Sequence, residues 1–414
     1  MERLIFHVDV NSAFLSWEAV RQVKAGKSDL RQIPSCIGGR PESRHGIVLA
    51  KSIPAKKFNI RTAEPLASAL RKCPNLVIVP PDFKLYVSCS RAFKAICRSY
   101  APVVEEFSID ECFLDMTGTE GVYADPLAIA WEIKNKIRDE LGFTVNVGVA
   151  RNKLCAKMAS DFEKPDKVHT LFPEEIPEKL WPLPVKDLLF IGGATAEKLE
   201  RAYIKTNGQL AQSPVEEVQR LLGDKTGLQA HRYANGIDNS PVSSEREKAK
   251  SYSNSVTLEQ NVTTLDMADA ILLSLADSVA SHMRADGMRA HCVSVGIRYL
   301  DFKTRSRQRT LDAGTDTTRR IYELSKQLLR ELWQDRKPLR LMSITLSDLS
   351  EGEEGQISLF QSDGADQEKH RKQDAAVDSI RKRFGYGMIQ RGSVFESGII
   401  TGRKFRAQEE ADEK

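Results

Sequence analysis

Three carboxylates on two apolar segments are the residues whose types and positions point most directly to chemistry. Asp110 and Glu111 are adjacent within a strand-like run over residues 107–115, and Asp9 lies near the end of an apolar run over residues 4–10. Because successive side chains of a strand point to opposite faces, Asp110 and Glu111 can serve one site only at a turn, a bulge or a strand end. Burying unpaired carboxylates is costly, and hard cations prefer oxygen ligands. The pattern predicts a magnesium-dependent phosphoryl-transfer centre, with an exposed hairpin tip as the alternative.

The segments that contain these carboxylates resemble the two metal-site motifs of the Y-family (translesion) DNA polymerases, of the DNA polymerase IV type. The motifs cover residues 7–14 (HVDVNSAF) and 108–111 (SIDE), and the similarity extends from residue 1 to about residue 360. Asn11 stands where these enzymes often carry a second Asp. That position is not the usual side-chain ligand, so Asp9 is still the candidate ligand.

The resemblance implies an enzyme that adds deoxynucleotides to a primer 3′ end opposite damaged or undamaged template, in DNA repair and damage tolerance. Two magnesium ions are then held by Asp9, Asp110, Glu111 and the carbonyl of Val10, and Glu111 also counts as a catalytic residue. One ion favours the primer 3′-hydroxyl as nucleophile, and the other steadies the triphosphate and the leaving pyrophosphate. Two other classes of protein are the alternatives. A nucleotide cyclase also uses palm carboxylates but needs no basic DNA-binding domain, and a non-catalytic DNA-binding accessory needs no complete set of carboxylates.

The implied architecture is an α+β multidomain protein shaped as a right-hand polymerase. It has a palm, small fingers, a helical thumb and a C-terminal α/β little-finger domain. We place the palm at residues 1–27 and 76–170, the fingers at 28–75, the thumb at 171–241, a linker at 242–250, the little finger at 251–349 and a flexible tail at 350–414.

After Asp9 the sequence pattern changes from strand to helix, and Phe14 starts the helix. Phe14, Trp17 and Val20 recur at helical spacing ahead of Gly26. Most aromatic residues at such spacing are core residues. The resemblance instead implies that Phe14 is the steric gate, packing where a ribose 2′-hydroxyl would otherwise lie.

Two lysine-containing segments are candidates for binding the triphosphate. Lys56 follows a proline-restricted turn, where the family usually has Tyr, Arg and Gly at the positions of Ile53, Lys56 and Asn59. Lys56 then offers a point charge in place of a bidentate guanidinium. Lys164, which precedes a proline, matches the family lysine that contacts the triphosphate, and Lys157 is a second candidate on the same segment. Solvated basic surfaces are the alternative reading.

Gly192 and Gly193 form a turn that leads into a helix, where backbone N–H groups can bind a DNA phosphate. The segment resembles a helix-hairpin-helix element that binds the DNA backbone. Phe190 stands where that motif has its first Gly, so a plain interhelical turn is the alternative.

A one-sided basic strand is the clearest electrostatic sign of nucleic-acid binding. Lys303, Arg305, Arg307 and Arg309 alternate with small polar residues, so all four cations share one face. Residues 284–309 contain seven basic residues against two acidic ones, a net charge of +5. Such an excess is typical of a surface that contacts phosphates.

The pentapeptide at residues 356–360 (QISLF) resembles the motif with which bacterial polymerases of this family bind the sliding clamp. Gln356, Leu359 and Phe360 are in matching places. An apolar pair in an acidic, glycine-containing tail indicates a partner's anchor, although a five-residue match also arises by chance. We therefore expect primer-template DNA, deoxynucleoside triphosphates and the sliding clamp as partners of a monomer.

Composition sets broad limits on the class of protein. The 414 residues are 41% hydrophobic, and 61 basic against 57 acidic residues give a net charge of +4, too mild to prove nucleic-acid binding. The seven cysteines include no CxxC pair, so neither a zinc site nor a disulfide framework is indicated. No leader or membrane-length apolar run is present, and we expect a cytoplasmic protein without membrane contact.

The elements that must position the carboxylates follow from periodicity. Strand 76–79, helix 86–100, the carboxylate hairpin, helix 128–141 and strand 144–150 predict an antiparallel or mixed sheet backed by helices. A final domain is predicted from helix 267–283, strands 293–299 and 302–310, helix 318–333 and strand 340–346.

Overall fold

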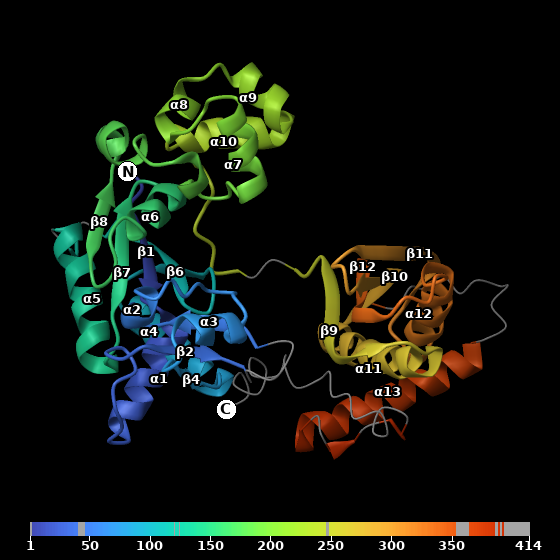
Figure 1. The fold of residues 1–414 in the computed structure, drawn as a ribbon. Coiled ribbons are helices and arrows are strands. Elements are labelled where there is room, and N and C mark those ends of the chain that lie inside the picture. The colour runs from blue at the N-terminus through green and yellow to red at the C-terminus, as the bar shows by residue number, and fades with distance from the viewer. Residues whose placement is uncertain are drawn as a thin grey trace. The chain divides into compact units, whose positions relative to one another are not determined.

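The computed structural model describes residues 2–39, 46–119, 121–123, 125–245, 248–352, 364–385, 388–389 and 391–392. These residues form two compact units, one from the described residues up to 245 and the other mainly from those beyond 247 (Figure 1). The first unit contains two sheets and a group of short helices. The second contains one sheet with its own helices.

A five-stranded mixed sheet is the core of the first unit. Its strands, in spatial order, are β5 (Val103–Glu106), β6 (Glu111–Asp115), β1 (Ile5–Val10), β7 (Val145–Ala150) and β8 (Val168–Leu171). β7 and β8 pair in parallel, and the other neighbours pair antiparallel. Every residue of β1 and β7 is buried, as is typical of strands covered on both faces. The expectation of a mixed sheet backed by helices is confirmed.

Helices lie against both faces of this sheet. They are α1 (Ala13–Lys24), α4 (Phe83–Arg98), α5 (Pro126–Leu141) and α6 (Lys153–Ser160). Phe6 and Val8 join the core formed with α1, α4 and α5. His7 and Asp9 alternate with them and so point to the opposite face, where α6 packs. Gly148 allows this close approach, because a Cβ there would lie 1.9 Å from a backbone oxygen of α6.

A small three-stranded sheet lies mainly within residues 28–75, the expected fingers. Its order is β3 (Val48–Lys51), β2 (Ser35–Gly38), β4 (Val77–Val79), and the helices α2 (Ile53–Lys56) and α3 (Leu66–Lys72) accompany it. β4 pairs in parallel with β2. The expectation that the palm resumes at residue 76 is therefore wrong for this strand, because a three-residue strand does not reveal in its sequence which sheet it joins.

The thumb consists of short helices, as expected. They are α7 (Gly193–Arg201), α8 (Asn207–Gln212), α9 (Val215–Leu222) and α10 (Asp224–Ala234), preceded by the single turns η1 (Pro173–Glu175), η2 (Ile176–Leu180) and η3 (Val185–Asp187). Figure 1 shows α7 to α10 gathered into one bundle. Their apolar residues continue the core that α6 shares with the palm sheet.

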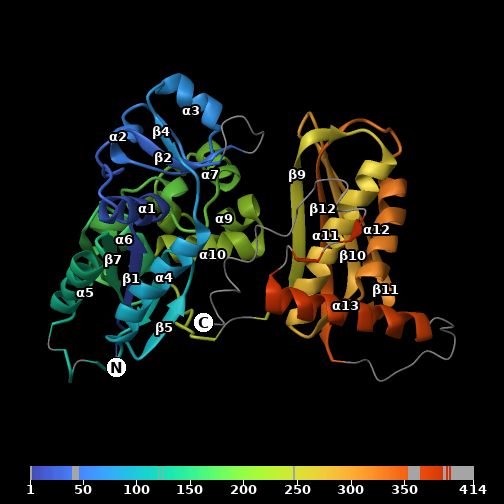
Figure 2. The same cartoon turned by 90° about the horizontal axis from the view of Figure 1, so that it is seen from below.

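The second unit is built on a four-stranded antiparallel sheet. In spatial order its strands are β11 (Thr304–Thr315), β10 (Met288–Tyr299), β12 (Leu339–Glu351) and β9 (Ser251–Val262). Two helices, α11 (Leu265–Ala285) and α12 (Thr318–Leu332), share a core with one face of it (Figure 2). The sequence analysis missed β9, because its alternating residues are mostly polar and it lies at the sheet edge.

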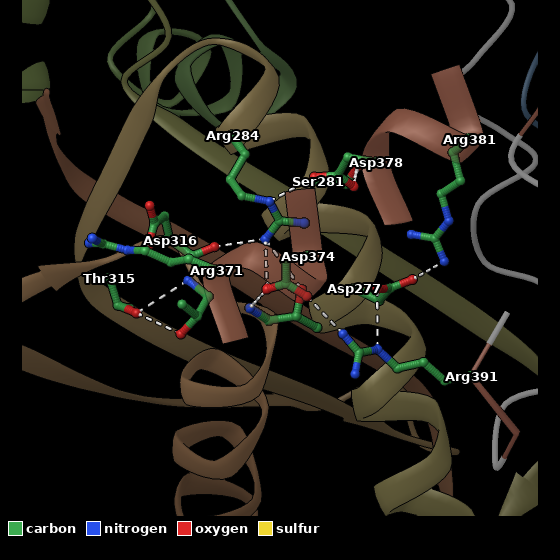
Figure 3. Close-up of polar contacts among 12 residues, drawn as sticks. Asp277, Ser281, Arg284, Thr315, Asp316, Arg371, Asp374, Asp378, Arg381 and Arg391 are labelled. Atoms are coloured by element: carbon green, nitrogen blue, oxygen red, sulfur yellow. Dashed lines mark hydrogen bonds and ion pairs between the residues drawn. The ribbon is translucent and has the colours of Figure 1, made fainter. Parts of the chain in front are cut away.

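A further helix, α13 (Gly364–Phe384), packs against α11 and α12. Charged groups of α13 contact both of these helices, as Figure 3 shows. Arg381, which is 1% exposed, pairs with Asp277 at 2.7 Å, and Arg284 pairs with Asp378 at 2.8 Å. The expectation of a flexible tail from residue 350 is therefore wrong for α13.

Candidate functional site

Asp9 and Glu111 face each other across two neighbouring strands. They are register partners in the antiparallel pair β1–β6, and Asp9 is 7% exposed. Asp110 immediately precedes β6, and its carbonyl accepts a hydrogen bond from the N–H of Val10 at 3.0 Å. The predicted carboxylates and Val10 therefore lie together at one end of two strands. This is the strand-end arrangement that the adjacent pair required.

The turn before β6 is held by side chains on both sides. Ser108 Oγ donates to Asp110 Oδ1 at 2.7 Å, which fixes the rotamer of that carboxylate. The carbonyl of Ser108 accepts from Lys94 Nζ at 2.7 Å, and Lys94 also pairs with Glu106 at 3.2 Å. Sequence reasoning missed Lys94, whose signal was a lysine at a core-facing position of an amphipathic helix.

Two lysines of the candidate triphosphate segment contact the carboxylates directly. Lys164 Nζ lies 3.0 Å from Asp9 and 2.8 Å from Asp161. Lys157 Nζ lies 2.7 Å from Glu111 and 5.4 Å from the centre of the Phe107 ring. The structure therefore brings both predicted lysines to the carboxylate cluster.

Burial controls the protonation of the site. It raises the pKa of Asp9 to about 7; Lys164 opposes that rise, and the neighbouring Glu111 adds to it. His7 lies on the same face of β1, and burial, with smaller effects of Lys157 and Lys164, lowers its pKa well below the usual value. His7 Nδ1 lies 2.8 Å from Ser160 Oγ, so the ring is a buried neutral group that orients a hydroxyl.

The donor set suits a hard divalent cation, although the side chains are turned toward other partners. Among the residues that the structure describes, no three His, Cys, Asp or Glu side chains are grouped closely enough to hold a metal ion as they stand. The cause is visible in the contacts, because Lys164 and Lys157 engage Asp9 and Glu111. Carboxylate and carbonyl oxygens are the ligands that magnesium prefers. The lysines supply the positive charge that such a cation would bring.

Phe14 is part of an aromatic cluster behind the carboxylates. Its ring stacks on Tyr86 with centroids 4.6 Å apart and planes 9° apart. Trp17 and Phe83 contact the same ring at 5.9 and 6.0 Å. The helix begins at Ala13, within a turn of Asp9, as the sequence predicted. Phe14 is held firmly but is only half-buried, so part of its ring is accessible.

Lys56 ends the short helix α2 and is exposed. Ser52 caps this helix by accepting from the N–H of Ala55 at 3.1 Å. Asn59 adopts a φ of 56°, a left-handed conformation that Gly adopts without strain. Lys51 is a second cation beside Lys56, and burial, then Lys56, lowers its pKa. The sequence analysis did not single out Lys51.

The predicted glycine turn of the thumb is formed. Gly192 is the N-cap of α7, and Gly193 is its first residue. No Cβ contact would arise at either glycine, so their backbone is open to a ligand. Phe190 has a φ of 67° and is 67% exposed, so this phenylalanine adopts the strained conformation of the Gly that it replaces.

The predicted basic strand is β11, and its three arginines share one face as expected. Their register partners on β10 are Val293, Val295 and Ile297, which belong to the core, so the arginines lie on the face that the helices cover. Arg307 and Arg309 each contact Glu331 of α12 at 2.6 Å. Arg305 lies 3.9 Å from Asp335, and Lys303 is 81% exposed. Carboxylates thus neutralise part of the predicted stripe.

The opposite face of this sheet carries mostly hydroxyl side chains. In register across the four strands it presents Ser251, Ser253, Ser255 and Thr257, then Ser343, Thr345 and Ser347, then Ser294 and Arg298, and finally Thr304, Ser306, Gln308 and Thr310. Ser253 Oγ and Thr345 Oγ1 lie 2.9 Å apart. Sequence reasoning did not predict this face. Its signal in the sequence is a small polar residue at every second position.

The clamp-motif residues Gln356, Leu359 and Phe360 lie outside the described residues. Of the helices that are described, none is both long and apolar enough to cross a membrane.

The chain is similar to known proteins in sequence and in fold. Residues 8–161 match the model of the impB/mucB/samB family, residues 249–359 match that family's C-terminal domain, and residues 186–238 match the thumb domain of DNA polymerase-iota. DNA polymerase IV of Clostridium acetobutylicum is 42% identical over 96% of this chain and 99% of its own. DNA polymerase IV 1 of Bacillus subtilis is 34% identical over 100% and 98%. A solved Y-family DNA polymerase chimera superposes with a TM-score of 0.73 and 22% identity, covering 84% of this chain and 100% of its own, which supports the fold.

Proposed function

The chain belongs to the DNA polymerase IV group of the Y-family DNA polymerases, and from this premise we propose that Asp9, Asp110, Glu111 and the Val10 carbonyl hold two magnesium ions. The protein is a template-directed translesion DNA polymerase, and its family depends on divalent metal. When bound, the ions activate the primer 3′-hydroxyl and neutralise charge on the triphosphate. The observation that carries this proposal is the register pairing of Asp9 with Glu111 beside Asp110.

Electron paramagnetic resonance of Mn²⁺ tests this site. The sample is a complex of the protein with a dideoxy-terminated primer-template and the next deoxynucleotide. The wild type should bind two ions per complex, and Glu111→Gln should bind fewer. Two ions in both proteins would contradict the assignment.

Lys164, Lys157 and Lys56 are the proposed phosphate ligands. The first two now pair with Asp9 and Glu111, and a cation bound between those carboxylates would compete with them. The released ammonium groups then face the added negative charge of a triphosphate. Phe14 is proposed as the steric gate, since its ring is clamped by Tyr86 one turn from Asp9.

DNA contacts are proposed at two places. Backbone N–H groups at Gly192 and Gly193 open α7 and would bind a phosphate without reading its base. Arg305, Arg307 and Arg309 on β11, with Lys303 just before it, would reach phosphates beyond the sheet edge, and Glu331 would compete for two of the arginines. The nucleotide cyclase alternative loses its support, because residues 249–359 match the C-terminal domain of the family.

The sliding clamp is the proposed protein partner, through Gln356, Leu359 and Phe360. The support is the sequence pattern between β12 and α13. Replacing all three by Ala should abolish stimulation by a loaded clamp and leave clamp-free extension unchanged. Full stimulation of the triple variant would refute the motif. We further propose a monomer acting in the cytoplasm, where its DNA substrate lies, and sedimentation of the purified protein tests its mass.

A further inference from the structure

Asn146 of β7 is the cross-strand neighbour of Asp9 and is fully buried. Its Nδ2 donates to the carbonyls of Ser160 and Glu163 at 3.0 and 2.7 Å. Its Oδ1 accepts from Asn11 Nδ2 at 3.1 Å and from the N–H of Lys167 at 3.3 Å. The amide therefore uses both of its hydrogens and both of its lone pairs.

Asn11, the residue that follows β1, completes this network. Its Nδ2 donates to Asn146, and its Oδ1 accepts from the N–H of Asp166 at 3.0 Å. The two side chains thus tie the segment 160–167 to the strand that carries Asp9. Asp166 is also held by Lys134, which is 2% exposed and pairs with it at 2.7 Å.

The orientation of both amides follows from their backbone partners. The N–H of Lys167 only donates, and the carbonyls of Ser160 and Glu163 only accept, so Asn146 must present its oxygen to Asn11. Asn11 must in turn present an N–H. An Asp at position 11 would set two acceptors against each other at about this distance, at the cost of an unmade buried hydrogen bond.

Lys164 lies between the anchored points of this segment. The network bonds the carbonyl of Glu163 and the N–H of Asp166, and Lys164 extends from there to reach Asp9 at 3.0 Å. We infer that Asn11 and Asn146 are positioning residues that fix Lys164 for the incoming triphosphate. This inference rests on the triphosphate role proposed for Lys164, and it gives a physical reason for the amide at position 11.

Single-turnover incorporation of one deoxynucleotide tests the inference. Asn11→Asp should raise the apparent Kd for the deoxynucleotide about tenfold and leave primer-template affinity within about twofold of the wild-type value. Asn11→Ala removes the amide without adding charge and should act in the same direction if Asn11→Asp does not fold. Asn254→Ala, which removes a buried amide from the second unit, is the matched control and should leave the nucleotide Kd unchanged.

A Lys164→Ala variant separates the proposed triphosphate role of Lys164 from the positioning role of Asn11 and Asn146. Lys164→Ala alone should weaken nucleotide binding, and Asn11→Asp added to it should weaken binding no further. No effect of Lys164→Ala would overturn the proposed triphosphate role and the inference with it. Two outcomes would overturn the positioning inference alone, provided that Lys164→Ala weakens nucleotide binding. In the first, Asn11→Asp binds the nucleotide as the wild type does. In the second, Asn11→Asp weakens binding as much in the Lys164→Ala variant as in the wild type.

Discussion

The ammonium group of Lys164 lies 3.0 Å from the carboxylate of Asp9. Asp9 is nearly buried and faces a second carboxylate, Glu111, across the strand pair. Two negative charges so close together, one of them nearly buried, are unfavourable without a compensating cation. Lys164 and Lys157 provide that compensation, and the divalent ion proposed for this site would give the same carboxylates a stronger partner.

Asp9→Asn should stabilise the metal-free protein at alkaline pH. The pKa of Asp9 is raised to about 7, mainly by burial, so the folded state favours the protonated carboxyl. The stability that this gives is present below about pH 4, near the unfolded pKa, and is lost as pH rises through the folded pKa near 7. Thermal unfolding in chelator should show a higher Tm for Asp9→Asn than for wild type at pH 8.

The difference in Tm between Asp9→Asn and wild type should become smaller as the pH falls toward about 4. Asp161→Asn, which removes the other partner of Lys164 from a half-exposed side chain, is the control and should not show this pH-dependent gain. A Tm of Asp9→Asn below that of wild type at pH 8 would mean that the pair with Lys164 outweighs the cost of burial.

Phe14→Ala should raise incorporation of ribonucleotides relative to deoxyribonucleotides. The stacked ring on Tyr86 occupies a fixed position, and its removal opens space for a 2′-hydroxyl. We expect the ratio of catalytic efficiencies to rise about tenfold or more. Phe83→Ala removes the edge contact to Phe14 from a 41%-exposed side chain and is the matched control. An unchanged ratio in Phe14→Ala would assign Phe14 to core packing.

Glu331→Gln should strengthen primer-template binding. Glu331 contacts Arg307 and Arg309 at 2.6 Å each, so its removal frees both guanidinium groups for phosphates. Arg307→Ala with Arg309→Ala should weaken binding and flatten its salt dependence by about one phosphate per arginine. Glu323→Gln makes the same charge change elsewhere on α12 and serves as control. Equal affinities for Glu331→Gln and wild type would place the arginines away from DNA.

Asp374→Ala should release α13 from the second unit. Asp374 is 3% exposed and accepts from the N–H of Thr318 at 2.8 Å and from Arg391 at 2.9 Å. Breaking this buried network should cost about 3–5 kcal/mol in the unfolding of the unit. Hydrogen exchange should show faster exchange in α13. Lys372→Ala, which breaks the exposed pair with Glu368, should cost no more than about 0.5 kcal/mol. Unchanged protection of α13 in Asp374→Ala would contradict this account of its docking.

The sequence predicted the site better than its surroundings, for physical reasons. Asp9 lies near the end of a strand-like apolar run, so its place in one site with Asp110 and Glu111 could be read from two strands, whereas its register pairing with Glu111 could not. Alternation placed Arg305, Arg307 and Arg309 on one face. Whether that face is the core face depends on Val293 and its neighbours in the paired strand. The local sequence of a strand does not reveal which strand it pairs with.

Other misses have the same origin. β9 presents polar residues at most positions, because it is an edge strand with one open face. Charged groups such as Arg381 and Asp374 hold α13 in place, so hydrophobic periodicity did not reveal its docking. Asn11 follows β1 and its partner Asn146 lies on β7, so only the folded sheet brings them together.

Primer extension by Asp110→Ala and Glu111→Ala, on undamaged and damaged templates, tests the central claim most directly. Both side chains are only partly buried, so the fold and DNA binding should persist, as circular dichroism and a binding titration can verify. Incorporation should fall by at least about 10³-fold in each variant. Extension at the wild-type rate by folded, DNA-binding Asp110→Ala or Glu111→Ala protein would contradict the assigned catalytic centre.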